Sequence, residues 1–174
     1  SANPELTRSL SDLQLRVRTM SLVHEQLYQS QEISLIPFDS YLRHLTLIIS
    51  GSFNNRRIVL QTETHPCNVA IDMALPLGLI INELITNAYK YAFPGDRTGN
   101  IWVRLHPEAD GKFCICVSDD GIGLPDDFAA PSTQTMGSQI VHILVRQIEA
   151  TFQVVNNGGA AFRILFTPAQ ETRL

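Results

Sequence analysis

The sequence predicts a two-layer α/β sandwich with a mixed, largely antiparallel sheet, preceded by a helical segment. A chain of 174 residues with 44% hydrophobic content suits one compact domain plus a modest helical extension. An apolar repeat with helical spacing runs through the first part, and helix-like and strand-like patterns interleave afterwards. Strand pairs joined by tight turns make the sheet at least partly antiparallel. We place the boundary between a segment 1–52 and a domain 53–174.

The charge pattern restricts the partners. The 13 basic and 17 acidic residues give a net charge of -4 with no long run of one sign, so we expect neither nucleic-acid binding nor direct membrane contact. The longest apolar run, 73–81, is far shorter than the ~20 residues that span a bilayer. The three cysteines, Cys67, Cys114 and Cys116, include no second pair for a zinc site and favour a reduced, cytoplasmic setting.

The first helix begins at an Asn3-Pro4 start signal. Its apolar positions form a heptad seam, which predicts packing along another helix. The seam consists of Leu6, Leu10, Leu13, Val17, Met20 and Leu27. A shorter helix around residues 41–49 is one candidate partner, although it is too short to cover the seam, and an arm upstream of Ser1 is the other.

Later elements follow from periodicity and turn residues. We expect strands at 58–62, 100–105, 112–118, 151–155 and 160–166, and helices at 72–93 and 137–150.

The long predicted helix carries the first chemical cluster. Glu83, Asn87 and Lys90 fall within about 60° of arc, with Tyr91 at the border. A carboxylate, an amide and an ammonium in an apolar helix need polar partners, which phosphate and hydrated Mg²⁺ would supply. A solvated stripe with an i,i+7 charge pair is the plain alternative.

Two glycine-containing segments follow. Asp119, Gly121 and Gly123 come directly after a strand, where an aspartate can accept a hydrogen bond from adenine and glycines let backbone approach a ligand. An ordinary strand-to-loop turn would look the same. Gly137 and Ser138 open a helix whose N-terminus could hold phosphate, and the polar stretch 125–136 before it would be a lid.

The order of these motifs resembles the Bergerat ATP-binding fold of histidine kinases, type II topoisomerases, ninety-kilodalton chaperones and mismatch-repair ATPases. Three sequence segments are similar to those of sensor histidine kinases with an atypical dimerisation domain. They are residues 16–30 (RVRTMSLVHEQLYQS), 76–84 (PLGLIINEL) and 87–94 (NAYKYAFP). The resemblance runs from about Arg16 to Phe166.

The resemblance implies ATP and Mg²⁺ as ligands. Asn87 would then coordinate the metal, Lys90 would contact phosphate, and Asp119 would bind adenine. Glu83 would be the general base or would orient the acceptor, and the remaining candidates, Tyr91, Gly121, Gly123, Gly137 and Ser138, would shape the nucleotide site. The same resemblance implies a homodimer through the N-terminal helices and a response-regulator receiver domain as partner.

The chain departs from the family pattern in two places. No acceptor-histidine string precedes Ser1, so we expect a chain cut before that segment. His24 mimics an acceptor dipeptide but falls in the seam, which favours a structural role, as we also expect for His142. The last glycine box, 158–161, has alanine where relatives often have a small hydroxyl residue.

The function that these patterns predict is the ATP-binding core of a histidine kinase. The alternatives are a histidine phosphotransfer or scaffold protein with a degenerate Bergerat domain, an ATP-hydrolysing clamp of the chaperone or topoisomerase kind, and a serine kinase of transcription regulators. The retained charged groups argue against the scaffold, because burying them has no structural benefit. The short lid argues against the clamp.

Overall fold

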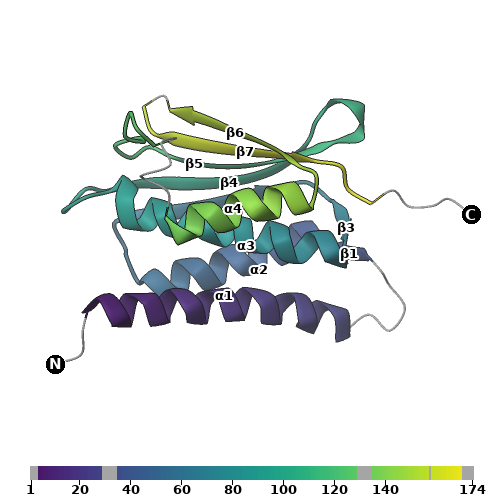
Figure 1. The fold of residues 1–174 in the computed structure, drawn as a ribbon, viewed down its shortest axis with the longest axis horizontal. Helices are drawn as coiled ribbons and strands as arrows, with labels where there is room; N and C mark the ends of the chain where they lie inside the picture. The colour runs from purple at the N-terminus through teal and green to yellow at the C-terminus, as the bar shows by residue number, and fades with distance from the viewer. Residues whose placement is uncertain (1–3, 29–34, 129–134, 157, 170–174) are drawn as a thin grey trace, which may run out of the picture.

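A five-stranded mixed sheet is covered on one face by helices. The computed structural model describes residues 4–28, 35–128, 135–156 and 158–169. Helices α2, α3 and α4 lie against the sheet, and α1 lies beyond them, on the side away from the sheet (Figure 1). This arrangement confirms the predicted α/β sandwich with helices before it and adds the position of α1 as an outer layer.

The elements follow one another as the sequence patterns indicate. In chain order they are α1 (Pro4–Tyr28), β1 (Leu35–Pro37), α2 (Phe38–Phe53), β2 (Ile58–Thr64), β3 (Asn68–Ala70), α3 (Ile71–Asn87), a π-helical turn (Ala88–Ala92), β4 (Gly99–Pro107), a 3₁₀ turn (Ala109–Gly111), β5 (Phe113–Asp119), α4 (Met136–Gln147), β6 (Thr151–Asn156) and β7 (Ala160–Phe166). The sequence analysis missed the short strands β1 and β3, which pair with each other.

The main sheet has the strand order β2-β4-β5-β7-β6. Strand β2 runs parallel to β4, and the other neighbours are antiparallel. Along β5 the side chains of Ile115 and Val117 are buried against the helices, and the same alternation places Asp119 at the end of the strand on that face. The central strand therefore leads directly from the core to the candidate site.

The long helix is not uniform. We expected one helix over 72–93, but α3 ends at Asn87 and a π-helical turn continues over Ala88–Ala92. A π-turn is rare and is found most often at functional sites. The segment Ile71–Ala92 is apolar enough to cross a membrane by length and mean hydropathy of 1.2, but 67% of its 18-residue window is buried inside the fold. Its apolar character is that of a core helix.

Helix α1 turns an unexpected face toward the rest of the molecule. Leu15 and Thr19 are buried, whereas the predicted seam residues up to Met20 are 40–59% exposed. The seam does not pack along α2, as we considered, because α2 meets the opposite side of α1. The side chain of Leu27 lies outside the described residues.

Tyr41 connects the three helices α1, α2 and α3. Its hydroxyl donates to the Thr19 carbonyl at 3.4 Å, and burial raises its pKa. A Cβ at Gly78 would lie 2.0 Å from the Tyr41 hydroxyl oxygen, so only glycine lets α3 approach this closely. This contact fixes α1 against α2 and α3.

Candidate functional site

Asp119 is a buried carboxylate at the end of β5. It is 9% exposed, and its Oδ1 accepts hydrogen bonds from the backbone N–H of Gly121 at 2.9 Å and of Ala160 at 3.4 Å. Burial raises the pKa of the carboxyl, and these two hydrogen bonds oppose that rise. Within the described part of the chain Oδ2 accepts no hydrogen bond, which leaves one oxygen of a fixed carboxylate available.

Close backbone contacts surround this carboxylate. A Cβ at Gly159, whose φ is +148°, would lie 2.0 Å from the Asp119 carbonyl oxygen, and one at Gly121 would lie 2.4 Å from the Ala92 carbonyl oxygen. The N–H of Ile122 donates to that Ala92 oxygen at 2.9 Å. The loop after β5 is thus held against the end of the π-helical turn, and both glycines are required by space.

Two further anchors, which the sequence analysis missed, hold the same loop. Asp120 accepts from the backbone N–H of Asn100 at 2.7 Å and from its side-chain amide at 3.0 Å. Burial alone would raise the pKa of Asp120, but the Asn100 hydrogen bonds lower it overall. Arg97 donates to the Asp120 carbonyl at 3.1 Å.

Gly123 is the second glycine of the loop. It has a φ of +78°, and a Cβ there would lie 2.6 Å from Asn156 Oδ1. Asn156 also binds the backbone of Leu124 through both side-chain atoms, at 2.9 and 3.0 Å. The β6–β7 connection therefore shapes the loop from the opposite side.

Glu83 lies on α3 in a separate cluster of contacts. Its side chain is 6% exposed, and Oε1 forms an ion pair with Arg16 Nε of α1 at 2.5 Å. The hydrogen bond to Glu83 raises the pKa of Arg16. A Cβ at Gly137 would lie 2.4 Å from Glu83 Oε2, so the start of α4 presses on the carboxylate. Gly137 is thus needed for space next to Glu83.

Asn87, Lys90 and Tyr91 lie where α3 becomes the π-helical turn. Lys90 Nζ forms an ion pair with Asp12 Oδ2 of α1 at 2.5 Å. Tyr91 is 62% exposed. Asn87 is partly buried, and its side chain has no hydrogen-bond partner among the residues that the structure describes. The predicted one-sided cluster is therefore divided: two charges face α1, and the amide is unpaired.

The start of α4 is capped by its own sequence. Thr135 Oγ1 accepts the N–H of Ser138 at 3.2 Å, and the Ser138 hydroxyl donates to the Thr135 carbonyl at 2.8 Å. Residues 129–134 of the predicted lid lie outside the described residues. Ser138 is consequently a helix-capping partner whose role toward a ligand stays a prediction.

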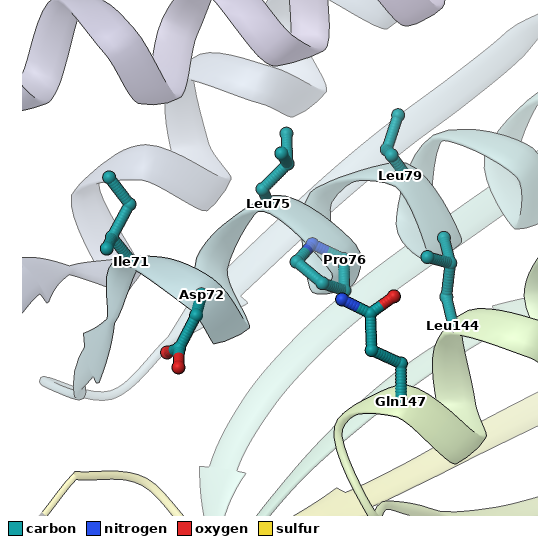
Figure 2. A pocket seen from close by; sticks show the side chains of 7 residues that line it. All are labelled: Ile71, Asp72, Leu75, Pro76, Leu79, Leu144 and Gln147. Carbon is teal, nitrogen blue, oxygen red and sulfur yellow. The ribbon is translucent and has the colours of Figure 1, made fainter.

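A pocket of about 320 Å³ lies elsewhere on the molecule. Figure 2 shows it between the first half of α3 and the end of α4, lined by Leu75, Leu79 and Leu144 with Asp72 and Gln147 at its polar side. None of its lining residues is a predicted nucleotide residue, and Leu79, the lining residue of α3 nearest to Asn87 in sequence, lies eight residues before it, or about 12 Å along a helix axis. This pocket and the predicted nucleotide residues are therefore separate sites.

The outer face of the sheet contains three side chains with metal-ligating atoms. His106, Glu108 and Cys114 bring these atoms within 4.8 Å of one another. Arg163 already donates to Glu108 Oε1 at 2.8 Å, and a side-chain hydrogen bond with Cys114 raises the pKa of Arg163. Because a permanent cation satisfies this cluster, it is better explained as an ion-pair network than as a metal site.

Of the two histidines that the sequence singles out, the structure describes the side chain of one, His142. His142 is exposed, and its ring stands edge-on to Phe152 at a centroid distance of 5.8 Å. The backbone of His24 belongs to α1, but its side chain lies outside the described residues. The structural role that we expect for His24 stays a prediction.

Comparisons with known proteins identify two regions of the chain. Residues 73–171 match the family described as "Histidine kinase-, DNA gyrase B-, and HSP90-like ATPase", and residues 1–53 match a family described as "Histidine kinase". The second match covers the N-terminal helices, so it gives no support to the expectation that the chain is cut before the acceptor segment.

Curated relatives agree with these matches. The chain is 28% identical over 154 residues to Blue-light-activated histidine kinase 2 of Erythrobacter litoralis (strain HTCC2594), covering 84% of this chain and 43% of the relative. It is 29% identical over 147 residues to Sensor histidine kinase PdtaS of Mycobacterium tuberculosis (strain ATCC 25618 / H37Rv), covering 83% and 29%. The chain thus spans less than half the length of either relative.

Solved structures lead to the same conclusion. The histidine kinase domain of the Erythrobacter litoralis EL346 blue-light activated kinase superposes with a TM-score of 0.83 and 25% identity, covering 90% of this chain and 75% of that chain. The Acinetobacter baumannii histidine kinase AdeS, at 20% identity and a TM-score of 0.65 over 98% of this chain and 87% of that one, shares the fold. The chain therefore belongs to the histidine kinase-, DNA gyrase B- and HSP90-like ATPase family, and it comprises this ATPase core and an N-terminal segment that matches a histidine kinase family.

Proposed function

We propose that this core binds ATP with Mg²⁺ at the junction of β5, the π-helical turn and α4, and transfers the γ-phosphate to a histidine. The products are ADP and a phosphohistidine, whose phosphate passes to an aspartate of a response-regulator receiver domain. Phosphoryl transfer depends mainly on positioning and charge neutralisation, so a few fixed groups are sufficient.

Asp119 carries the proposal. It is a buried carboxylate with Oδ1 fixed by two backbone N–H groups and Oδ2 unpaired within the described residues. A hydrogen-bond acceptor held in this way suits the exocyclic amine of adenine. Gly121 and Gly123 would let the ring and ribose approach the backbone of the loop, and the exposed Tyr91 would border the nucleotide.

The phosphate end of the nucleotide would meet Asn87, Lys90 and the start of α4. Asn87 fits a Mg²⁺ ligand, because it has an unpaired amide oxygen within the described residues and Mg²⁺ prefers oxygen donors. Bound Mg²⁺ would neutralise phosphate charge. Lys90 would contact the phosphates directly. At the N-terminus of α4, Gly137 would add a backbone N–H donor, and Ser138 would do the same on releasing its N–H from Thr135 Oγ1.

Glu83 is the candidate group for handling the acceptor histidine. Its carboxylate is nearly buried and paired with Arg16, and in this proposal it would accept an N–H from the imidazole or orient it. The exposed seam of α1 supports the proposed homodimer, because an apolar stripe of that length suits a partner helix. The 52/53 domain boundary and a cytoplasmic location stay predictions.

Photoaffinity labelling tests the adenine position. We expect 8-azido-ATP to label peptides containing 113–123 or 158–166, with ATP and ADP as competitors. Asp119→Asn should remove most of the labelling, and the matched control Asp110→Asn, an exposed turn acid, should not. Labelling confined to the pocket of Figure 2, or none at all, would contradict the proposal and favour a phosphotransfer scaffold without nucleotide.

A further inference from the structure

Helix α1 supplies two charged side chains to the part of α3 that the proposed function uses. Asp12 and Arg16 are one helical turn apart and lie on the same face of α1. Asp12 pairs with Lys90, and Arg16 pairs with Glu83, each at 2.5 Å. An acid and a base on α1 thus face a base and an acid on the continuous α3 and π-helical segment.

The two pairs differ in burial. Side-chain exposure is 21% for Arg16 and 6% for Glu83, but 27% for Lys90 and 29% for Asp12. The Arg16–Glu83 pair is therefore an internal contact that keeps a buried carboxylate compensated. The Asp12–Lys90 pair lies at the edge, where a ligand from solvent reaches the ammonium.

Two buried polar atoms lie close to Glu83 in the sequence of α3. Asn82 Oδ1 and Thr86 Oγ1, one residue before and three residues after Glu83, are buried with no hydrogen-bond partner among the described residues. Unpaired buried polar atoms oppose the packing that buries them. The charge pairs with α1 therefore stabilise a region in which some buried polar atoms lack hydrogen bonds.

Two anionic groups compete for the single ammonium of Lys90: the Asp12 carboxylate and, in the proposed function, the nucleotide phosphate. In the proposed function Lys90 contacts phosphate, yet in the structure its Nζ is bound to the Asp12 carboxylate. A phosphate that binds this ammonium must displace the Asp12 carboxylate or share the ammonium with it. Either change weakens the contact between α1 and the π-helical turn. The coupling free energy between the two events is reciprocal. If docking of α1 weakens phosphate binding, phosphate binding therefore weakens docking of α1 by the same amount.

We propose that Asp12 is a positioning residue that competes with nucleotide phosphate for Lys90, so that docking of α1 lowers the affinity of the site for phosphorylated nucleotides. Arg16 anchors the same helix through Glu83 and keeps Asp12 opposite Lys90. The inference rests on the proposed function for the role of Lys90. It adds two residues of α1 to the nucleotide site and couples the position of α1 to its occupancy.

Isothermal titration of the whole chain with a non-hydrolysable ATP analogue and, separately, with adenosine tests the inference. Asp12→Asn should tighten binding of the analogue about two- to fivefold, the change that a partly exposed ion pair supplies, and should leave adenosine unchanged. The gain should vanish in the Asp12→Asn/Lys90→Gln double variant. Asp110→Asn, which removes an equivalent charge from an exposed turn, should give no gain.

The outcomes separate the inference from the proposed function. Equal affinity of wild type and Asp12→Asn for the analogue, an equal gain for adenosine, or a gain that persists without Lys90 would overturn the inference while leaving nucleotide binding intact. Absence of binding by both proteins would overturn both proposals.

Amide hydrogen exchange supplies a second readout. It should rise around residues 12–19 of α1 when the analogue binds and stay constant with adenosine. Unchanged exchange with the analogue bound would equally contradict the inference.

Discussion

The loop after β5 and the charged face of α3 each hold a buried carboxylate, but the groups that compensate the two carboxylates differ. Asp119 is buried, and its Oδ1 accepts from the backbone N–H groups of Gly121 in the adjoining loop and of Ala160 in the neighbouring strand β7. Glu83 is buried to a similar degree but is satisfied by the Arg16 side chain of a separate helix. The end of the site that we propose for adenine is therefore fixed by the sheet and the loop after β5, whereas the end that we propose for phosphate and acceptor depends on where α1 lies.

Breaking the Arg16–Glu83 pair should have the largest effect on stability. Arg16→Met leaves a 6%-exposed carboxylate uncompensated and should lower the free energy of unfolding by about 3 kcal/mol, toward the lower end for buried pairs because Arg16 keeps 21% exposure. Chemical denaturation measures this loss. Arg18→Met, at an exposed position of the same helix, is the control, and an equal loss in both would show that the pair is unimportant.

Removing the Asp119 charge should act on ligand binding more than on stability. Asp119→Asn retains an oxygen for the Gly121 N–H but loses a charged acceptor for adenine, so nucleotide should bind about 2 kcal/mol, or roughly 30-fold, more weakly. Binding assays with ATP and ADP measure the effect. Undiminished affinity for both nucleotides would remove Asp119 from the adenine site.

Substitution of Gly159 tests the close backbone contact next to Asp119. Gly159→Ala places a Cβ 2.0 Å from the Asp119 carbonyl at a φ of +148°, and it should cost about 2 kcal/mol of stability. Gly158→Ala has the same change at a φ of +67° with no atom within 4 Å, and it should cost about 1 kcal/mol. Thermal melting compares the pair. If Gly158→Ala proved the more damaging, the contact would not be the reason for glycine here.

Acidification should weaken nucleotide binding slightly through Asp119. Burial raises the pKa of this carboxyl, so protonation begins at a higher pH than for an ordinary aspartate and removes the ionised acceptor as pH falls. The raised pKa of Asp119 in the folded state increases the free energy of unfolding only at acid pH, and this contribution is lost as the pH rises through the folded-state pKa. Affinity should therefore fall progressively as the pH is lowered from neutral into the acid range. Asp119→Asn should show no such change, and a wild type as flat as this variant would contradict the assignment.

The backbone arrangement around Asp119 could be predicted from sequence because its signals are local, while the contact of Asp119 with adenine stays a prediction. The strand pattern that ends at Asp119, the spacing of Gly121 and Gly123, and the asparagine-glycine turn before β7 all lie in short stretches. Their anchors were missed, because the bonds of Asp120 to Asn100 and of Asn156 to Leu124 join strands that are far apart in sequence.

The α1 side could be predicted only in part. The periodicity of α1 predicts its length, but its most apolar stripe is exposed, and Leu15 and Thr19 take the buried positions. The pairing of Asp12 and Arg16 with α3 depends on helix packing, which a hydrophobic repeat does not encode. The π-helical turn after Asn87 likewise follows from tertiary contacts such as the Ala92–Ile122 hydrogen bond, and a helical pattern cannot reveal it.

Calorimetric titration of a non-hydrolysable ATP analogue with Mg²⁺ into the wild-type chain, with Asn87→Ala and Asp119→Ala as matched variants, tests the central claim most directly. The account predicts saturable binding at one site in the wild type, and its loss in both variants while circular dichroism shows them folded. Absence of binding by the wild type, or binding that survives both substitutions, would contradict it.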